Sequence, residues 1–500
     1  MRGTIGTQGL AVLLQRPASQ EEDSLRRSPT GAATGELAAV ELPHAPSPTE
    51  ALGRLEGLPG RVLLHSAGPR GRYSFLAAVP RAVLVTRAGE TRVLEGDGAR
   101  AGPIISDPFT GLEQLLARFG STPSPGVGPF SGGMVGFLSY ECGRYLERLP
   151  APPPDDLGMP EAWFGVYDCA VVWDRVSGRC IATGADRGDG KGMDRLQAIC
   201  ARLHEEGKTA VSTGAGTPPA GTASGGRVPL TSALSRSEFL TRVERIRAYV
   251  RAGDLFQANL TRRIDAPTQI SGEELYRRLL AESPAEFSAY LDTGEGEVAS
   301  ISPELFLSVR DGKVRTGPIK GTAPRGKNEE EDRALSAALA ASAKDRAENV
   351  MIVDLLRNDF SRVCRAGSIR VPRLAELETL PTVHHLVSSV TGVLEPAAGA
   401  VDLLRATFPG GSITGAPKIR AMEILSELEP VRRGVYTGAL GILSFDGSMD
   451  LSVAIRTAVV RDGRASYGTG AGITLPSDAE AEWQETEEKA LAFVRAIGAA

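Results

Sequence analysis

Cysteine is scarce in this 500-residue sequence, which has five, at Cys142, Cys169, Cys180, Cys200 and Cys364. No two of them form a Cys-x-x-Cys pair, and an odd number at irregular spacing does not indicate a disulfide framework. A reduced, cytoplasmic chain therefore fits best. The sequence also lacks a His-Glu-x-x-His motif and any Cys/His array. This excludes the zinc sites that such motifs mark.

Long apolar runs and runs of one charge are missing as well. No stretch approaches the roughly 18 apolar residues of a membrane span, and the amino terminus lacks the pattern of a secretory signal. The net charge is only -5 at pH 7, and no Lys/Arg-rich run stands out. We therefore expect neither a membrane nor a nucleic acid as a partner. A hydrophobic content of 42% is enough for one large core or two ordinary ones.

Two segments of low complexity divide the chain. Residues 1–45 are rich in Ser, Thr, Ala, Gly and charge, and we expect them to be a loose extension. Residues 208–230 have the composition of a flexible linker. The linker separates an amino-terminal region, 46–207, from a carboxy-terminal region, 231–500.

The hydrophobic pattern predicts helices and strands in alternating groups. Phe239, Val243, Ile246 and Val250 recur at three and four residues, which is typical of an amphipathic helix. Further helices are predicted over 273–282, 332–363, 417–428 and 477–497, and strand-like segments over 434–445, 449–463 and 465–474. Strands in runs with helices between them favour an α+β fold with largely antiparallel sheets.

Acidic residues gather on two of the predicted helices. Glu482, Glu485 and Lys489 are three and four residues apart and so lie on one helical face. Asp345 and Glu348 lie one turn apart on another helix. Each set alone is typical of a solvated surface. Mg²⁺, however, takes one or two carboxylates together with substrate oxygens, so two such helices could also meet around an ion.

Two glycine-rich segments are interpreted as turns when each is considered alone. The segment "FPGGSITGAPKIRAM" runs into a predicted helix, but it does not match the nucleotide-binding pattern GxxxxGK[ST]. The segment "YGTGAGIT" reads as a turn or a strand bend, in which Gly470 and Gly472 would let the backbone approach a carboxylate closely.

Together these segments resemble the chorismate-utilising family, which includes the first components of anthranilate and aminodeoxychorismate synthases and the isochorismate and salicylate synthases. The matching motifs occur in family order: "GDLFQANL", "SPELFL", "GPIKGTAPRG", "ENVMIVDLLRND", "VHHLVSSVTG", "FPGGSITGAPKIRAMEIL", "GVYTGALG", "LSVAIRT", "GTGAGI" and "EWQETEEKA". So many ordered motifs are highly specific, although any one alone would be weak. The resemblance implies two large, mostly antiparallel sheets packed face to face, with helices on the outside.

The resemblance also implies a magnesium ion and a substrate pocket. Glu348 and Glu485 match the Mg²⁺ ligands, Glu482 is a nearby third carboxylate, and the ion would hold the ring carboxylate of chorismate. The other positions match residues that contact the substrate: Arg456 and Tyr436 at the pyruvyl carboxylate, Gly470, Ala471 and Gly472 as an anion-binding turn, Lys489 near a substrate carboxylate, and His385 and Ser412 near the reacting ring.

Two positions indicate the branch of the family. Gln257 stands where isochorismate and salicylate synthases use a lysine to activate water, which disfavours water addition. Lys320, in "PIKGT", stands where anthranilate synthases usually have Ala. The resemblance is therefore closer to the aminodeoxychorismate branch, in which this lysine adds to the ring and Glu304 protonates the departing hydroxyl. The anthranilate branch is the alternative.

A lysine needs a special environment to act as a nucleophile, because its ordinary pKa of about 10.4 leaves little free amine near neutrality. We expect Lys320 to be partly desolvated and close to cations such as Arg325; alone, it would read as a surface lysine. The cysteines lack a glutaminase signature, so the resemblance implies a separate glutamine amidotransferase subunit as partner. It also implies a possible tryptophan site near Ser66 and Tyr73.

Overall fold

The computed structural model of the chain describes residues 38–96, 100–120, 130, 132–187, 189–204, 227–381 and 383–499. Within them the chain forms two sheets of 12 strands each. The strand pairings in both sheets are antiparallel, which confirms the α+β fold that the sequence predicts.

The first sheet contains strands from both regions of the chain. In spatial order its strands are β1 (Ala38–Glu41), β10 (Arg179–Gly184), β9 (Cys169–Asp174), β3 (Tyr73–Ala77), β2 (Val62–His65), β13 (Phe287–Asp292), β14 (Glu297–Ser302), β23 (Thr457–Arg461), β24 (Arg464–Ile473), β12 (Gln257–Pro267) and β11 (Thr231–Ser232), with β20 (Gly415–Ala416) paired to β12.

The second sheet is built in the same way. Its strands follow the order β17 (Ile319–Pro324), β19 (Val383–Val393), β16 (Lys313–Gly317), β15 (Leu305–Arg310), β22 (Met449–Val453), β21 (Ala439–Ser444), β7 (Gly133–Leu138), β8 (Ala162–Tyr167), β4 (Ala82–Arg87), β5 (Glu90–Glu95) and β6 (Arg100–Ala101), with β18 (Arg370–Thr379) paired to β19. The regions before and after the linker thus share both sheets and form one continuous fold.

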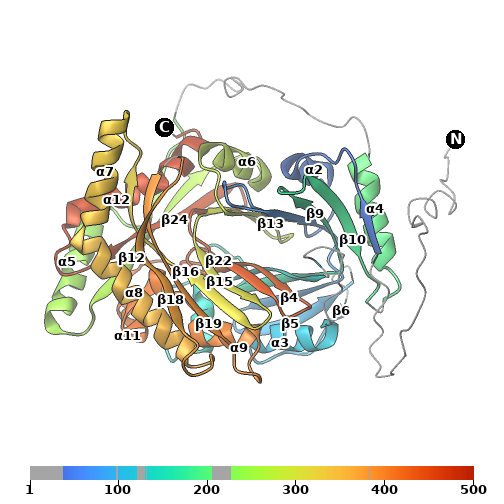
Figure 1. The fold of residues 1–500 in the computed structure, drawn as a ribbon, viewed down its shortest axis with the longest axis horizontal. Coiled ribbons are helices and arrows are strands. Elements are labelled where there is room, and N and C mark those ends of the chain that lie inside the picture. Colours follow the sequence, from blue (N-terminus) through green and yellow to red (C-terminus); the bar gives the residue numbers. More distant parts are fainter. Residues whose placement is uncertain are drawn as a thin grey trace.

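Helices cover the outer faces of both sheets. They are α2 (Pro48–Arg54), α3 (Pro108–Phe119), α4 (Gly192–His204), α5 (Arg236–Ala252), α6 (Gly272–Glu282), α7 (Glu329–Ala341), α8 (Ala343–Ser361), α9 (Ala400–Thr407), α10 (Gly411–Thr414), α11 (Lys418–Leu428) and α12 (Ala479–Ala496), with a 3-10 turn at Tyr140–Tyr145. Figure 1 shows one sheet above the other, with α2 and α6 above the upper sheet and α3 and α9 below the lower one.

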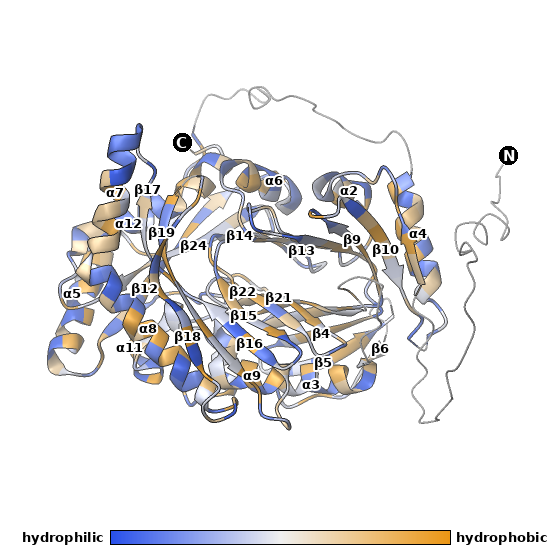
Figure 2. Cartoon of the chain, in the orientation of Figure 1, coloured by the Kyte–Doolittle hydropathy of each residue, from blue (hydrophilic) through white to orange (hydrophobic). Residues whose placement is uncertain are grey.

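Apolar side chains fill the layers of this arrangement. One buried cluster, which includes Ala77, Phe137, Trp163 and Leu440, lies between the two sheets. Larger clusters lie between each sheet and its helices. In Figure 2 the interior strands β4, β9 and β10 are largely orange, whereas the helices carry blue residues on their outer sides. Burial on both faces therefore fixes the position of the sheets.

Two expectations about local structure were wrong, and a third was incomplete. Residues 38–41 are not a loose extension: they form β1, which pairs with β10, and Leu42 after them is buried; residues 1–37 and most of the expected linker lie outside the described residues. The helix predicted over 332–363 is two helices, because Ser342 ends α7 and its side chain caps α8. The segment 449–463 is two strands, and these belong to different sheets.

Candidate active site

The strand pair β12 and β24 forms one wall of the site. Gly470 and Gly472 pair with Thr261 and Asn259 and share a face of the sheet. A Cβ atom on Gly472 would lie 2.5 Å from Nε2 of Gln257 and 3.7 Å from Oε2 of Glu348. The expected anion-binding turn at 470–472 is therefore a regular strand. Its glycines leave room for the side chains that face it.

Helices α8 and α12 bring the predicted metal ligands to this wall. Glu348 of α8 and Glu482 of α12 are 9% and 2% exposed. On α12 the Nζ atom of Lys489 donates to Oε1 of Glu485 at 2.6 Å and to the carbonyl oxygen of Gly470 at 2.9 Å. The helical spacing of these α12 residues places them on the side facing α8 and the end of β24, as the sequence predicts.

The carboxylates of the site have opposite pKa shifts. Burial raises the pKa of Glu348, while the charges of Lys320 and Lys344 oppose that rise. Burial also acts to raise the pKa of Glu485, but Lys489, Lys320 and Lys344 outweigh it and hold that pKa below 4.5. Glu485 is therefore an anion near neutral pH, and the site has both a negative charge and cations close to it.

The residues present fit a magnesium ion only in part. Within the described ranges no three His, Cys, Asp or Glu side chains converge closely enough to form a complete metal centre. Oε2 of the buried Glu482 nevertheless has no hydrogen-bond partner, and the bare face of Gly472 leaves space beside Glu348. Such a site suits a hard cation that takes one or two carboxylates and completes its shell with substrate oxygens.

Lys320 lies in an irregular part of β17. The pairing of β17 with β19 shifts register between Ile319 and Thr322, so Lys320 and Gly321 form a bulge. Gly321 has φ 85, and a Cβ there would lie 3.0 Å from the side chain of Asp345 on α8. A glycine is required at this position, both for its backbone conformation and for the close approach of the helix.

Hydrogen bonds fix Lys320 on both sides. Its Nζ atom donates to the carbonyl oxygen of Ser412 at 2.9 Å, and its own carbonyl oxygen accepts from Nδ2 of Asn349 at 2.9 Å. Asn349 is fully buried and also accepts from the hydroxyl of Ser388 at 2.9 Å. The half-buried amine thus has a defined position, as expected for a group that reacts.

The expected role of Arg325 was wrong. Its guanidinium binds Asp332, with Nε 2.7 Å from Oδ1, and donates to the carbonyl oxygen of Leu380 at 2.8 Å. The charge of Lys320 acts on the carboxylates of Glu304, Glu348 and Glu485. The sequence places Arg325 only five residues from Lys320, but the strand carries the two side chains to different partners.

Glu304 is a buried acid beside the lysine. It is 5% exposed, and the hydroxyl of Ser412 donates to its Oε1 at 2.5 Å. Burial raises its pKa to about 7, although the hydrogen bond from Ser412 and the charges of Lys320 and Lys489 act against that rise. A large fraction of this carboxyl group is therefore protonated near neutrality.

Arg456 lies where the chain passes from one sheet to the other, between β22 and β23. It has φ 53, an uncommon value for a residue with a side chain, and such backbone strain concentrates at functional positions. In the part of the chain that the structure describes, its guanidinium has no hydrogen-bond or ion-pair partner. It is thus available to bind an anion.

His385 and Tyr436 are close enough to Arg456 for its charge to act on both. Burial lowers the pKa of His385 to about 4, so the ring is neutral at pH 7, and its Nδ1 lies 2.9 Å from Oγ1 of Thr322. The Tyr436 ring packs on Gly468, where a Cβ would lie 2.2 Å from the ring.

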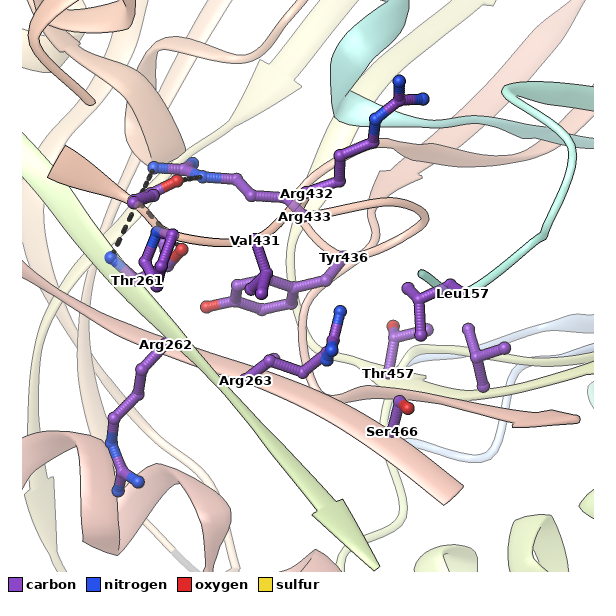
Figure 3. A pocket seen from close by; sticks show the side chains of 14 residues that line it. Leu157, Thr261, Arg262, Arg263, Val431, Arg432, Arg433, Tyr436, Thr457 and Ser466 are labelled. Carbon is purple, nitrogen blue, oxygen red and sulfur yellow. Dashed lines mark hydrogen bonds and ion pairs between the residues drawn. The ribbon is translucent and has the colours of Figure 1, made fainter. Parts of the chain in front are cut away.

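A hollow that Tyr436 helps to line lies next to this site. Figure 3 shows Tyr436 there with Arg263, Thr457 and Ser466, while Arg433 extends to its hydrogen-bond partners. Tyr436 is the one predicted site residue in its lining. The arginines around the hollow are paired with carboxylates, for example Arg433 with Glu429 at 2.7 Å. We therefore assign the chemistry to the lysine and carboxylate cluster.

Comparison with known proteins shows the family of the chain. Residues 61–495 match the family model of the chorismate binding enzymes. Aminodeoxychorismate synthase component 1 of Klebsiella aerogenes is 41% identical over 461 residues, which cover 90% of this chain and 97% of that protein. Anthranilate synthase component 1 of Streptomyces coelicolor is 42% identical over 403 residues, covering 79% of this chain and 78% of the other.

The chain belongs to the chorismate-binding enzyme family.

A solved structure of this family has the same fold. The crystal structure of anthranilate synthase component I from Streptococcus pneumoniae superposes with a TM-score of 0.74 at 32% identity, covering 85% of this chain and 93% of that one. Among the described residues no helix is both long and apolar enough to cross a membrane. The tryptophan site that the resemblance implies near Ser66 and Tyr73 stays a prediction.

Sequence reasoning missed two residues of the site. Lys344 donates to Oε1 of Glu482 at 2.9 Å, and Asn349 holds the backbone of Lys320. Both are on the same helix as Glu348: Lys344 lies four residues before it and Asn349 one residue after it. The four-residue spacing could have indicated that Lys344 lies near Glu348. Nothing in the local pattern could have indicated the partner of Asn349, because that contact joins residues far apart in the chain.

Proposed function

We propose that the protein is component I of an aminodeoxychorismate synthase, which converts chorismate and ammonia to 4-amino-4-deoxychorismate for para-aminobenzoate and folate biosynthesis. The observation that carries this proposal is the meeting of Lys320 and Glu304 at Ser412, where one residue binds the amine through its carbonyl oxygen and the acid through its hydroxyl. A nucleophile and an acid held side by side are what the reaction requires.

The reaction proceeds in two substitutions with allylic shift. Once its ammonium group has released a proton to solvent, the Lys320 amine forms a bond to ring carbon 2, the double bond moves, and the bond from carbon 4 to its hydroxyl breaks. Glu304 gives its proton to the departing oxygen, which leaves as water. Ammonia then forms a bond to carbon 4, the double bond moves back, and the bond to Lys320 breaks with its electron pair returning to the nitrogen.

The remaining residues bind and orient the substrate in this proposal. Arg456, with Tyr436 beside it, takes the pyruvyl carboxylate, and Lys489 lies near a second carboxylate. Glu348 and Glu485, with Glu482 as a third carboxylate, would hold Mg²⁺, which when bound neutralises the ring carboxylate. His385 stays neutral and contributes a hydrogen-bonding group at the ring. Cations that converge on the two carboxylates of the substrate fix the ring in front of the amine.

Ammonia would come from a separate glutamine amidotransferase subunit. Glutamine hydrolysis by a cysteine needs a thiolate, and a thiolate forms readily only where the thiol pKa is lowered. In this chain burial raises the pKa of each of the five cysteines: Cys142, Cys169, Cys180, Cys200 and Cys364. None of them is prepared for that chemistry.

Anthranilate synthase component I is the second candidate, favoured by relatives of similar identity. The two activities differ in their products. We expect the purified chain, given chorismate, Mg²⁺ and ammonium, to form a product with the mass of aminodeoxychorismate and to release no pyruvate. Anthranilate fluorescence with stoichiometric pyruvate would contradict the proposal and establish the second candidate. No consumption of chorismate with any supply of ammonia would contradict both.

A further inference from the structure

Lys344 joins the two helices that carry the carboxylates. It lies in the first turn of α8, and its amine donates to Oε1 of Glu482 on α12 at 2.9 Å. The Glu482 side chain is 2% exposed, whereas that of Lys344 is 42% exposed. The anion is therefore fixed inside the protein, while the cation reaches it from the solvent side.

Lys344 also influences the other two carboxylates. Its charge acts on Glu348, one helical turn further along α8, and on Glu485. A single amine thus contacts one of the three acidic residues assigned to the metal and acts by its charge on the other two. A divalent cation at this position would act on the same carboxylates.

The other two lysines of the site are held elsewhere. Lys489 binds the Gly470 carbonyl oxygen as well as Glu485, and Lys320 binds the Ser412 carbonyl oxygen. Lys344, in contrast, has Glu482 as its one hydrogen-bond partner among the described residues. Its long, flexible stem can move into solvent with the loss of that single bond.

The second oxygen of Glu482 shows that the amine satisfies the site only in part. Oε2 of Glu482 is buried and has no hydrogen-bond partner. A buried carboxylate oxygen without a partner is energetically unfavourable, so this atom favours a ligand with more charge than one ammonium group provides.

We propose that Lys344 is a tethered counter-ion that occupies the cation position between α8 and α12 until a divalent ion displaces it. This inference rests on the assignment of Glu348, Glu482 and Glu485 as metal ligands in the proposed function. Lys344 competes with the ion, so the free enzyme binds the metal weakly. Substrate carboxylates add the negative charge that lets the ion displace the amine, and metal and substrate therefore bind together.

Metal titration of the free enzyme tests this role without any catalysis. Mg²⁺ and Mn²⁺ are titrated by calorimetry into the wild type, Lys344→Met and Arg346→Met, with neither chorismate nor ammonia present. Arg346 is exposed in the same first turns of α8, so its variant removes an equal charge without removing the tether. We expect the Kd of Lys344→Met to fall by about tenfold or more, because a unit positive charge beside the ion is removed, and that of Arg346→Met to change by less than about twofold.

Thermal unfolding gives a second readout that also checks folding. Without metal, Lys344→Met should unfold at a lower temperature than the wild type, because Glu482 is left buried and unpaired. Added Mg²⁺ should raise the unfolding temperature of this variant more than that of the wild type.

Metal binding by Lys344→Met that is equal to or weaker than that of the wild type would overturn the proposal, as would an equal gain in Arg346→Met. Failure of the proposed function is distinguished by the product assay. A chain that makes anthranilate could still show the tighter metal binding in Lys344→Met.

Discussion

The site has two ends that are built differently. At the carboxylate end, Glu482 and Glu485 on α12 are paired with the lysines Lys344 and Lys489, whose side chains are 42% and 41% exposed. At the nucleophile end, the Lys320 amine donates to the carbonyl oxygen of the buried Ser412, and the hydroxyl of the same serine donates to Glu304. At the first end Lys344 can leave with the loss of a single bond, whereas at the second end the amine and the acid are both fixed through Ser412.

This difference separates binding from chemistry. Partly exposed ion pairs contribute little to stability and rearrange at low cost, which suits a place where ions and substrate enter and leave. Buried, short hydrogen bonds hold reacting groups in position before the substrate arrives. We therefore expect variants at the nucleophile end to change kcat, and variants at the carboxylate end to change the metal requirement.

The largest effect is expected from Lys320→Ala. Removal of the proposed nucleophile should lower kcat for amination by about 10³-fold or more. The metal should bind no more weakly than in the wild type, because the charge of Lys320 acts on Glu348 and Glu485 and its loss favours a cation beside them. Steady-state kinetics with ammonium and a metal titration measure both. Unchanged kcat would exclude covalent catalysis by this residue.

A smaller effect, of a different kind, is expected from Glu348→Gln. Loss of one carboxylate should raise the Mg²⁺ concentration for half-maximal activity by at least about tenfold, with a smaller loss of kcat at saturating metal. Activity measured against Mg²⁺ concentration separates the two. If kcat falls at saturating metal while the metal requirement stays constant, the two ends are not distinct.

The smallest effect is expected from Ser412→Ala, which keeps the carbonyl oxygen that binds Lys320 and removes the hydroxyl that binds Glu304. We expect kcat to fall by about fivefold, the value of one ordinary hydrogen bond. Glu304 acts as an acid, so activity falls as pH rises through its pKa of about 7. In the wild type the hydrogen bond from Ser412 lowers the pKa of Glu304. Without this bond the pKa rises, so the loss of activity at alkaline pH should move to higher pH in the variant. If the pH at which activity is lost does not change in the variant, that loss belongs to a group other than Glu304.

Local sequence patterns predicted many of the helices and strands but not which strands pair with one another. The amphipathic helix at Phe239 and the acidic face of α12 follow from periodicity, since both depend on neighbours within two turns. The sheet to which each strand belongs does not follow from periodicity. The strands before and after Arg456, β22 and β23, are close in the sequence, yet the chain changes sheets between them, because distant strands determine each pairing.

The candidate residues themselves were predicted by resemblance, and their contacts were not. Ordered motifs placed Lys320 and Glu304 in one site, but the role of Ser412 between them depends on a contact across 92 residues. Arg325 shows the opposite case: closeness in sequence suggested an influence on Lys320, and the strand directs it to Asp332 instead. Side-chain direction in a bulged strand is decided by tertiary packing, which a single sequence does not contain.

The amide of Asn349 has one more consequence. It ties the Lys320 carbonyl oxygen to α8 at the residue directly after Glu348, so the amine and the carboxylate belong to one rigid body. The Lys320 backbone and the helix that carries Glu348 therefore cannot shift independently while this bond holds. Loss of the amide, as in Asn349→Ala, is expected to disturb both ends of the site at once.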